Sequence, residues 1–256
     1  MNGAFHIGSI GLGAQQRALD VIANNISNAN TPAFRRSSVR FSEVLATGAG
    51  GALAADMGAS LATSAGVRSE VLFMINEQGQ IQATGSALDL AIDGAGFIEL
   101  MGPGGQTLLW RGGTLEVGED GMLKAQGGLP LKAAISVPAD ASAIEIGADG
   151  VVRAVIGEAA ERSEIGQIML VKVSDALGVE RLDGGLYRVE DPSRLAEARP
   201  GEDGVGLLAQ GALEGSNVEL SAEMVQLLMV QRAYAANAQI VQAADQLMAM
   251  ANGLRR

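Results

Sequence analysis

Apolar residues recur at every seventh position near both ends of this chain. Near the N-terminus, where the last repeat also has a second apolar position, the series is Phe5, Leu12, Leu19, Ile22 and Ile26. Near the C-terminus the same spacing joins Leu220, Leu227, Tyr234, Val241 and Met248. Side chains at this spacing lie along one stripe of an α-helix. The pattern therefore predicts one helix at each end of the chain, each with an apolar stripe.

The residues at the helix ends support these two predictions unequally. Ser216 followed by Glu219 fits a capping box for the C-terminal helix, and Asn217 is a competing N-cap. Gly253 lies where that helix should stop. Within the N-terminal segment four residues are poor helix formers, each costing up to about 1 kcal/mol relative to Ala: Gly3, Gly8, Gly11 and Gly13. We expect the N-terminal helix to be disordered in the free monomer and to fold on docking.

Two apolar stripes at opposite ends of one chain favour a coiled coil that brings the termini together. Each stripe would otherwise expose a strip of apolar side chains to water. The ten stripe residues are then the candidate assembly interface. The alternative is that two amphipathic helices simply cover an ordinary core, and the periodicity alone does not separate these two interpretations.

The middle of the chain has a different pattern, with short β-prone runs separated by turn residues. Asp-Gly, a dipeptide favoured at tight hairpin turns, occurs at 93–94, 120–121, 149–150, 183–184 and 203–204. This pattern predicts antiparallel strands connected by hairpins. The predicted fold class is α+β, in which two paired terminal helices accompany a β-rich middle domain.

The domain limits follow from these changes in pattern. We predict a helical domain from residues 1–34 and 213–256, an extended linker arm at 35–78, and the β-rich domain at 79–212. Most of the segment Ala46 to Gly66 is Gly, Ala, Ser or Thr, which bury little surface alone. It is interpreted either as an arm that becomes ordered against neighbours or as a plain flexible loop.

Composition excludes several classes of function. A net charge of -11 repels phosphate backbones, so nucleic acid is a poor candidate partner. The chain has no Cys and a single His, which excludes a thiolate nucleophile, a multi-His metal site and a His-based triad. We therefore expect no metal, cofactor or catalytic residue. The start lacks a basic region followed by an apolar run, and no stretch reaches the 18 apolar residues of a membrane helix. We therefore expect neither a cleaved signal peptide nor a membrane span.

Three longer segments resemble the flagellar rod and hook proteins. They are Leu19 to Phe41, Leu88 to Leu100 and Leu213 to Leu247, which cover both ends of the chain and the entry to the β domain. The residues that match the family's terminal motifs are Asn24, Asn25, Asn28, Pro32, Phe34, Gln231 and Arg232. Within the family, length and the C-terminal helix favour a distal rod subunit over a proximal rod or hook-type subunit.

The resemblance implies a structural protein rather than an enzyme. Such a subunit would be exported through the flagellar export apparatus and would polymerise helically into the hollow rod that crosses the periplasm. Implied partners are further copies of this chain, other rod and hook subunits, and the surrounding ring proteins. Two other classes stay open: a cell-wall hydrolase with two carboxylates converging in the β domain, and a soluble binding module with helical ends.

Overall fold

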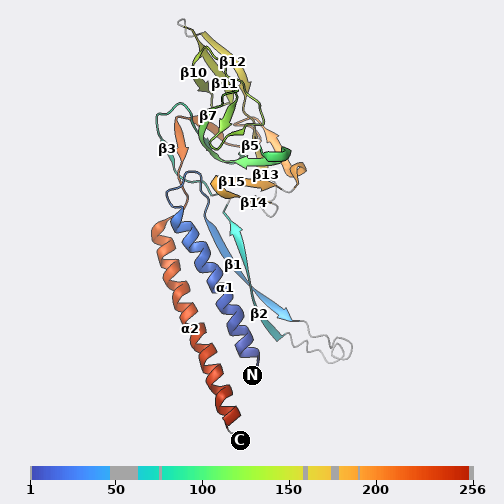
Figure 1. Ribbon diagram of the computed structural model, residues 1–256, viewed down its shortest axis with the longest axis vertical. Helices are drawn as coiled ribbons and strands as arrows, with labels where there is room; N and C mark the ends of the chain where they lie inside the picture. The colour runs from blue at the N-terminus through green and yellow to red at the C-terminus, as the bar shows by residue number, and fades with distance from the viewer. Residues whose placement is uncertain are drawn as a thin grey trace. The chain divides into compact units, whose positions relative to one another are not determined.

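The computed structural model describes residues 2–46, 63–74, 77–157, 161–173, 179–189 and 191–253. For residues 2–6, 43–46, 63–66, 183, 248 and 251–253 it describes the backbone alone. Over these ranges the chain is α+β, with two α-helices and antiparallel strand pairs, as the sequence predicts. It divides into two units (Figure 1): the helical unit, Met1–Ser27, Ser37–Met74 and Glu219–Arg256, and the β body, Asn28–Arg36 and Ile75–Val218.

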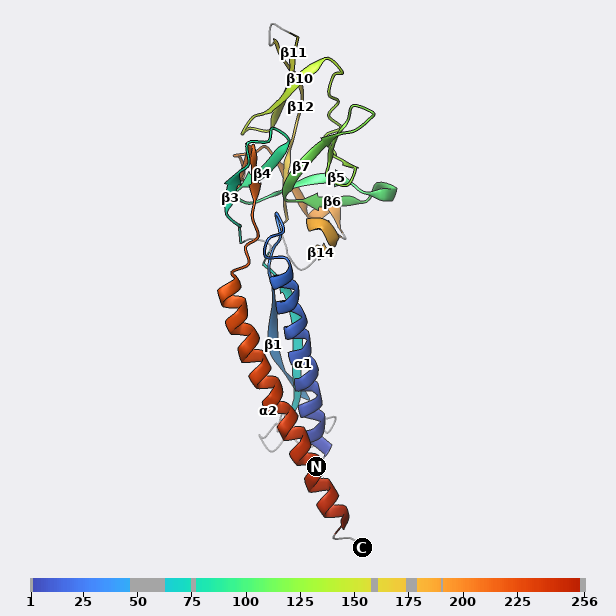
Figure 2. The same ribbon diagram turned by 60° about the vertical axis from the view of Figure 1, so that its left-hand side comes forward.

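The helical unit combines the two helices with one strand pair. Helix α1 (Asn2–Ser27) and helix α2 (Leu220–Gly253) lie side by side, as both ribbon views show (Figures 1 and 2). Strands β1 (Ser37–Ala46) and β2 (Thr63–Phe73) form an antiparallel pair, and both contact α1. Residues 47–62, between these strands, lie outside the described residues. Most of the segment Ala46 to Gly66, for which the sequence predicts an arm or a flexible loop, therefore lies outside them too.

The first crossing between the two units comes directly after helix α1. Helix α1 ends at Ser27, and the following residues to Arg36 belong to the β body. The predicted arm at 35–78 supplies β1 and β2, whose pairing satisfies backbone groups that an isolated arm would leave to water.

The expected cap of α2 is wrong. Ser216 lies four residues before the first helical residue, Leu220, and its Oγ accepts a hydrogen bond from Val218 N–H at 3.2 Å. Asn217 is not the N-cap either, because its side-chain oxygen accepts from the backbone N–H of Arg36 at 2.6 Å. The side chain of Asn217, which the local pattern assigns to the helix end, therefore bonds a residue that is distant in sequence.

The β body consists of four antiparallel sheets over its described residues. The strand orders are β14-β15-β6-β5-β13-β16, β17-β4-β7-β8-β9, β10-β11-β12 and β18-β3. The strands are β3 (Ile81–Ala83), β4 (Asp89–Asp93), β5 (Phe97–Met101), β6 (Thr107–Trp110), β7 (Gly112–Val117), β8 (Leu123–Ala125), β9 (Leu129–Pro130), β10 (Ala141–Ile146), β11 (Val151–Ile156), β12 (Glu161–Gln167), β13 (Leu170–Val173), β14 (Val179–Arg181), β15 (Leu186–Val189), β16 (Leu195–Ala198), β17 (Leu207–Gln210) and β18 (Ala212–Glu214). Short 3-10 turns occur at Pro103–Gly105, Asp183–Gly185 and Pro192–Arg194.

Not every Asp-Gly pair closes a hairpin. The pairs at 120–121, 149–150 and 183–184 connect strands that are hydrogen-bonded neighbours, as predicted. The pairs at 93–94 and 203–204 instead lead from one sheet to another, so the hairpin prediction is wrong there. Gly94 has φ 118°, and a Cβ on it would lie 2.7 Å from Gly206 Cα. At this position glycine permits the close approach of two backbones as well as the turn.

Each unit has its own buried apolar cluster, and the two clusters differ greatly in size. In the β body, one cluster connects residues from the six-, five- and three-stranded sheets, including Leu90, Leu123 and Val152, all with 0% exposure. In the helical unit the buried cluster is Ala18, Ile22 and Val230. Apolar burial stabilises by about 25 cal/mol per Å², so most of the hydrophobic stabilisation of the described fold comes from the β body.

Candidate assembly surface

The centre of the helix pair is formed by residues from both predicted stripes. Ile22 of α1 is 4% exposed and packs with Ala18 and with Val230 of α2. The partly buried side chains around this cluster are Leu19, Ile26, Val39 and Leu227. Four of the ten predicted interface residues, Leu19, Ile22, Ile26 and Leu227, therefore meet in one place.

The other stripe residues diverge from this centre. Leu12 and Val241 are half-buried, whereas Leu220 and Tyr234 are 43% and 37% exposed. The side chains of Phe5 and Met248 lie outside the described residues. A straight α-helix drifts by about 20° per heptad, so a strict sevenfold stripe gradually turns away from its partner.

Two glycines of α1 allow the helices to approach closely. A Cβ on Gly8 would lie 2.7 Å from Val241 Cγ2, and one on Gly11 would lie 2.9 Å from the side-chain nitrogen of Asn237. A Cβ on Gly13 would meet nothing within 4 Å. Gly8 and Gly11 thus act through packing, in addition to the helix-weakening effect that composition indicates. The missed signal is the spacing of small residues, since Ala14 and Ala18 continue the same buried face.

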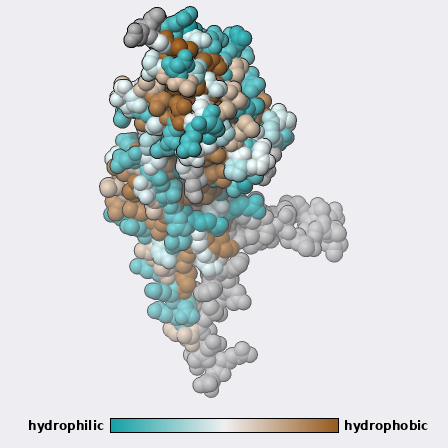
Figure 3. Space-filling model, turned by 45° about the horizontal axis from the view of Figure 1, so that its top comes forward, coloured by the Kyte–Doolittle hydropathy of each residue, from teal (hydrophilic) through white to brown (hydrophobic). Residues whose placement is uncertain are grey.

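Helix α2 has a second apolar face that α1 does not cover. Its large side chains are between 52% and 59% exposed, and they are Met224, Val225, Leu228, Met229, Ile240, Leu247 and Met250. Apolar side chains, brown in Figure 3, reach the surface in both the upper and the lower part of that view. The only charged residues of α2 are Glu223, Arg232 and Asp245. A helix that is apolar on two faces is typical of one that is buried on both sides.

An apolar groove of about 340 Å³ lies between the elements of the helical unit. Ala14 of α1 and Val230 of α2 are its buried part. Phe41 of β1, Val67 of β2 and Met229 of α2 line its more open part, and they are 47%, 37% and 59% exposed. The groove and the uncovered face of α2 are adjoining apolar surfaces, since Met229 belongs to both.

The β body contains a buried charged network that sequence reasoning missed. The carboxylate of Glu214 lies 2.6 Å from Arg35 Nη2 and 3.0 Å from Arg111 Nε, and all three side chains are at most 3% exposed. Burial lowers the pKa of Arg111, and the charge of Glu214 opposes this shift. Tyr187, with 0% exposure, has a pKa raised by burial. Arg35 and Glu214 are 179 residues apart, so no local pattern connects them.

The carboxylates that line one groove of the β body do not form a catalytic pair of the expected kind. That groove, of about 740 Å³, is lined by Glu119 and Asp120, which are consecutive residues of one turn. Asp120 Oδ2 pairs with Lys124 Nζ at 2.9 Å, and this hydrogen bond lowers the pKa of the carboxyl. A lowered pKa disfavours the role of general acid.

The described part of the chain has no group of three or more His, Cys, Asp or Glu residues that could hold a metal ion. Among the same residues, no helix is both long and apolar enough to span a membrane.

Similarity to known proteins identifies the family. Three family models match: "Flagella basal body rod protein" over residues 5–35, "Flagellar hook protein FlgE/F/G D1 domain" over 91–154, and "Flagellar basal body rod FlgEFG protein C-terminal" over 209–254. The flagellar basal-body rod protein FlgG of Bacillus subtilis is 35% identical, with 99% of each chain covered. The chain belongs to the flagellar basal-body rod protein family.

Further relatives distinguish rod from hook. The FlgG protein of Caulobacter vibrioides is 32% identical over 98% of this chain and 99% of its own length. The flagellar hook protein FlgE of Rhizobium meliloti is 36% identical, but over 50% of this chain and 30% of its own length. The predicted resemblance to a rod protein, and to the distal type in particular, is thereby confirmed.

The rod family's terminal motif residues occupy different environments in this member. Asn25 is 1% exposed and connects α1 to β1: its side-chain nitrogen donates to Ser37 O at 2.8 Å, and its side-chain oxygen accepts from Ser37 N–H at 2.9 Å. Phe34 is buried in the β body, where the guanidinium of Arg181 lies 3.9 Å from its ring centroid. Asn25 and Phe34 thus fix the chain just after α1 within their own units.

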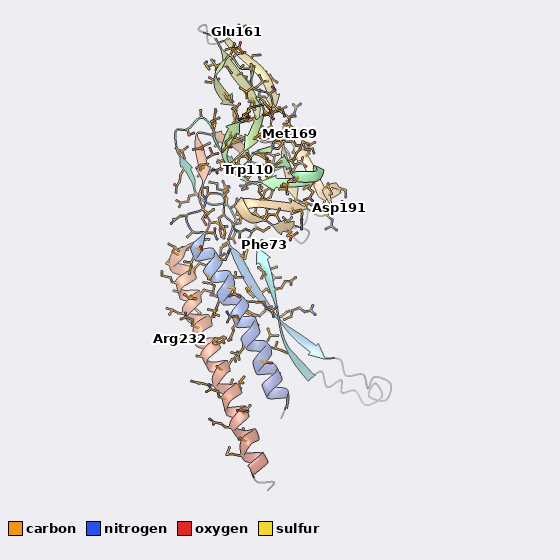
Figure 4. The ribbon with its side chains drawn as sticks, viewed as in Figure 1. Phe73, Trp110, Glu161, Met169, Asp191 and Arg232 are labelled. Atoms are coloured by element: carbon orange, nitrogen blue, oxygen red, sulfur yellow. The ribbon has the colours of Figure 1, made fainter. Side chains whose placement is uncertain are left out.

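The remaining motif residues are more accessible. Asn24 at the end of α1, Pro32 in the loop beyond it, and Gln231 and Arg232 on α2 are all exposed, and Arg232 is labelled in Figure 4. Asn28 is half-buried, and its side-chain oxygen accepts a hydrogen bond from Thr31 Oγ1 at 3.2 Å.

Proposed function

We propose that this rod-family protein is the structural subunit of the flagellar basal-body rod. Copies polymerise helically into a hollow shaft that transmits torque and conducts exported proteins. The observation that carries the proposal is the second apolar face of α2, where large side chains are more than half exposed and charges are few. Such a surface stays in water only at a cost of about 25 cal/mol per Å², and a neighbouring subunit would remove it from water.

The paired helices are the assembly element in this proposal. The stripe of α1 and the stripe of α2 form a coiled-coil seam around Ile22 and Val230, and Gly8 and Gly11 let the helices approach. The uncovered face of α2 on one copy then packs against the groove beside Phe41 and Met229 on the next. Because these two surfaces differ, the interface is heterologous, and a heterologous interface that does not close produces a filament.

Location and partners follow from the same assignment. The subunit would reach the rod, which crosses the periplasm, through the flagellar export apparatus. Other rod subunits and hook subunits would continue the same helical lattice, and ring proteins would surround it. The N-terminal helix would fold on docking. The exported monomer would therefore not assemble before it reaches the rod. Hydrogen exchange on the monomer would show weak protection in α1.

Electron microscopy of the concentrated purified protein tests the proposal. The wild type should form tubes of uniform diameter, whereas an enzyme or a soluble binding module would stay monomeric. Met229→Gln should raise the concentration at which tubes appear, because it puts a polar amide on both apolar surfaces. Gln231→Met, which changes another exposed position of α2, is the control and should not raise that concentration. A wild type that stays monomeric at every concentration would contradict the proposal.

A further inference from the structure

The chain passes between its two units four times, after residues 27, 36, 74 and 218. Three segments of the β body lie next to these crossings: 33–36, 77–80 and 214–217. They are far apart in sequence, yet hydrogen bonds join segment 214–217 to each of the other two. We call this set of segments, together with the Arg111 side chain, the junction node.

Backbone hydrogen bonds form the frame of the junction node. Ala33 N–H donates to Glu214 O at 2.7 Å, and Gly215 N–H donates to Gln80 O at 2.8 Å. Segment 214–217 is therefore bonded on one side to 33–36 and on the other side to 77–80. A Cβ on Gly79 would lie 1.9 Å from Gly215 O, so only glycine permits this approach.

Asn217 adds side-chain bonds to the same segments. Its oxygen accepts from Arg36 N–H at 2.6 Å, and its nitrogen donates to Glu77 O at 2.9 Å. Both partners lie within three residues of a crossing, because the chain crosses after residues 36 and 74. One neutral side chain thus connects three segments that lead to the helical unit.

The carboxylate of Glu214 is the centre of the node. One oxygen accepts from Gly79 N–H at 2.7 Å and pairs with Arg35, and the other pairs with Arg111. Arg111 in turn donates to the backbone oxygens of Gly94 and Gly96, at the turn between β4 and β5. Glu214 therefore links the crossing segments to the strands that carry the large core.

Stability alone gives a weak reason for burying this network. A buried ion pair often contributes no more to stability than apolar residues of similar volume, and its best-attested value is to specify one arrangement. Here the arrangement specified is the mutual position of three segments that lead to the helical unit. A second buried carboxylate, Glu99, pairs at 2.7 Å with Nζ of the half-exposed Lys132 and joins no crossing segment, so the same carboxylate-to-amide change there provides a comparison outside the node.

We infer that Glu214 is a positioning residue that joins the crossing segments into one mechanical joint. A single peptide segment transmits tension but yields to torsion, because its φ and ψ bonds rotate freely. Three segments bonded side by side resist twisting as a unit. In a polymer that transmits torque, these three segments of the β body would carry the load together. This inference rests on the proposed function, in which the polymer transmits torque.

Hydrogen exchange on the full chain tests whether the node acts as one unit. In Glu214→Gln the amides of Ala33, Gly79, Gly215 and Asn217 should exchange together at least about tenfold faster, because they open as one cooperative region. In the control Glu99→Gln these amides should keep wild-type rates. Faster exchange confined to Gly79, which loses its own acceptor, would overturn the inference.

A second variant and a mechanical measurement complete the test. Asn217→Ala removes neutral bonds without leaving a buried charge, so it should fold even if Glu214→Gln does not, and it should speed the same amides. Tubes of either variant should form but have a shorter persistence length in electron micrographs than tubes of wild type or Glu99→Gln. Unchanged stiffness in both would overturn the mechanical role. A wild type that forms no tubes would refute the proposed function while leaving the exchange result to stand.

Discussion

The helical unit and the β body bury their apolar residues in different ways. The β body packs a continuous cluster between sheets, and its central strands β4 and β5 are buried over most of their length. The helical unit buries three residues fully in its cluster, while Met224, Leu228 and Met229 of α2 stay more than half exposed. The β body therefore gains more of its stability from apolar burial, whereas the helical unit leaves an apolar surface that neighbouring subunits would cover under the proposed function.

The helical unit and the β body also differ in their buried polar groups. In the β body Arg35, Arg111 and Glu214 form a charged network, and the helical unit uses the neutral side chain of Asn25 for its corresponding connection. A charged network fixes one arrangement strongly, because removing one partner leaves an uncompensated charge.

A charge in the helix seam should abolish assembly while leaving the β body folded. In Leu227→Asp a carboxylate enters the cluster around Ile22, at a cost of several kcal/mol. Sedimentation should detect no polymer, while thermal unfolding followed by the β signal in circular dichroism keeps the wild-type midpoint. Gln226→Asp adds the same charge at an exposed neighbour and should still polymerise. Polymerisation of Leu227→Asp at wild-type concentration would remove the seam from the proposal.

A cavity in the β body should have the opposite outcome. Leu90→Ala removes a side chain with 0% exposure and should lower the free energy of unfolding by about 2–5 kcal/mol, as measured in urea. The variant that remains folded at low temperature should still assemble, because its helical unit is unchanged. Met101→Ala, at a site 49% exposed, should change the free energy by less than about 0.5 kcal/mol. Equal effects of the two substitutions would contradict the described core.

Alanine at two glycines of α1 should act in opposite directions. Gly13→Ala should stabilise α1 by up to about 1 kcal/mol, since its Cβ enters open space and Ala favours helix. Gly8→Ala gains the same propensity but meets Val241 at 2.7 Å, and overpacking costs about 1–3 kcal/mol. Helix content and the critical concentration for assembly would be measured for both variants. The close approach of α1 and α2 would be refuted if Gly8→Ala assembled as readily as Gly13→Ala.

Alkaline pH should destabilise the β body through Tyr187. Burial raises the pKa of this hydroxyl above the ordinary 10.0, so the folded state keeps its proton while the unfolded state loses it. The contribution of Tyr187 to stability is thus complete below pH 10 and is lost as pH rises toward the folded pKa, at no more than about 1.4 kcal/mol per pH unit. Urea unfolding between pH 9 and 11 should show a steeper decline for wild type than for Tyr187→Phe. Parallel declines would mean that Tyr187 is not desolvated.

Local pattern was a good guide to the elements and a poor guide to their ends. The sevenfold stripes predicted both helices, because apolar periodicity follows from the geometry of a helix. The antiparallel middle was predicted from its turns, because Asp-Gly has a conformational preference of its own. The competing cap at Asn217 is wrong because its side-chain oxygen accepts a hydrogen bond from Arg36 N–H, 181 residues away in the sequence.

The fold class, the two helices and the family can be predicted from the amino-acid order, since each depends on patterns within short windows or on long matching segments. The role of Gly8 and Gly11, the groove beside Phe41, and the joining of Arg35, Arg111 and Glu214 become visible in the folded chain alone. The cause of this difference is distance along the chain. Steric contact and charge compensation depend on which residues meet in space, and the local sequence around a residue does not indicate its distant contacts.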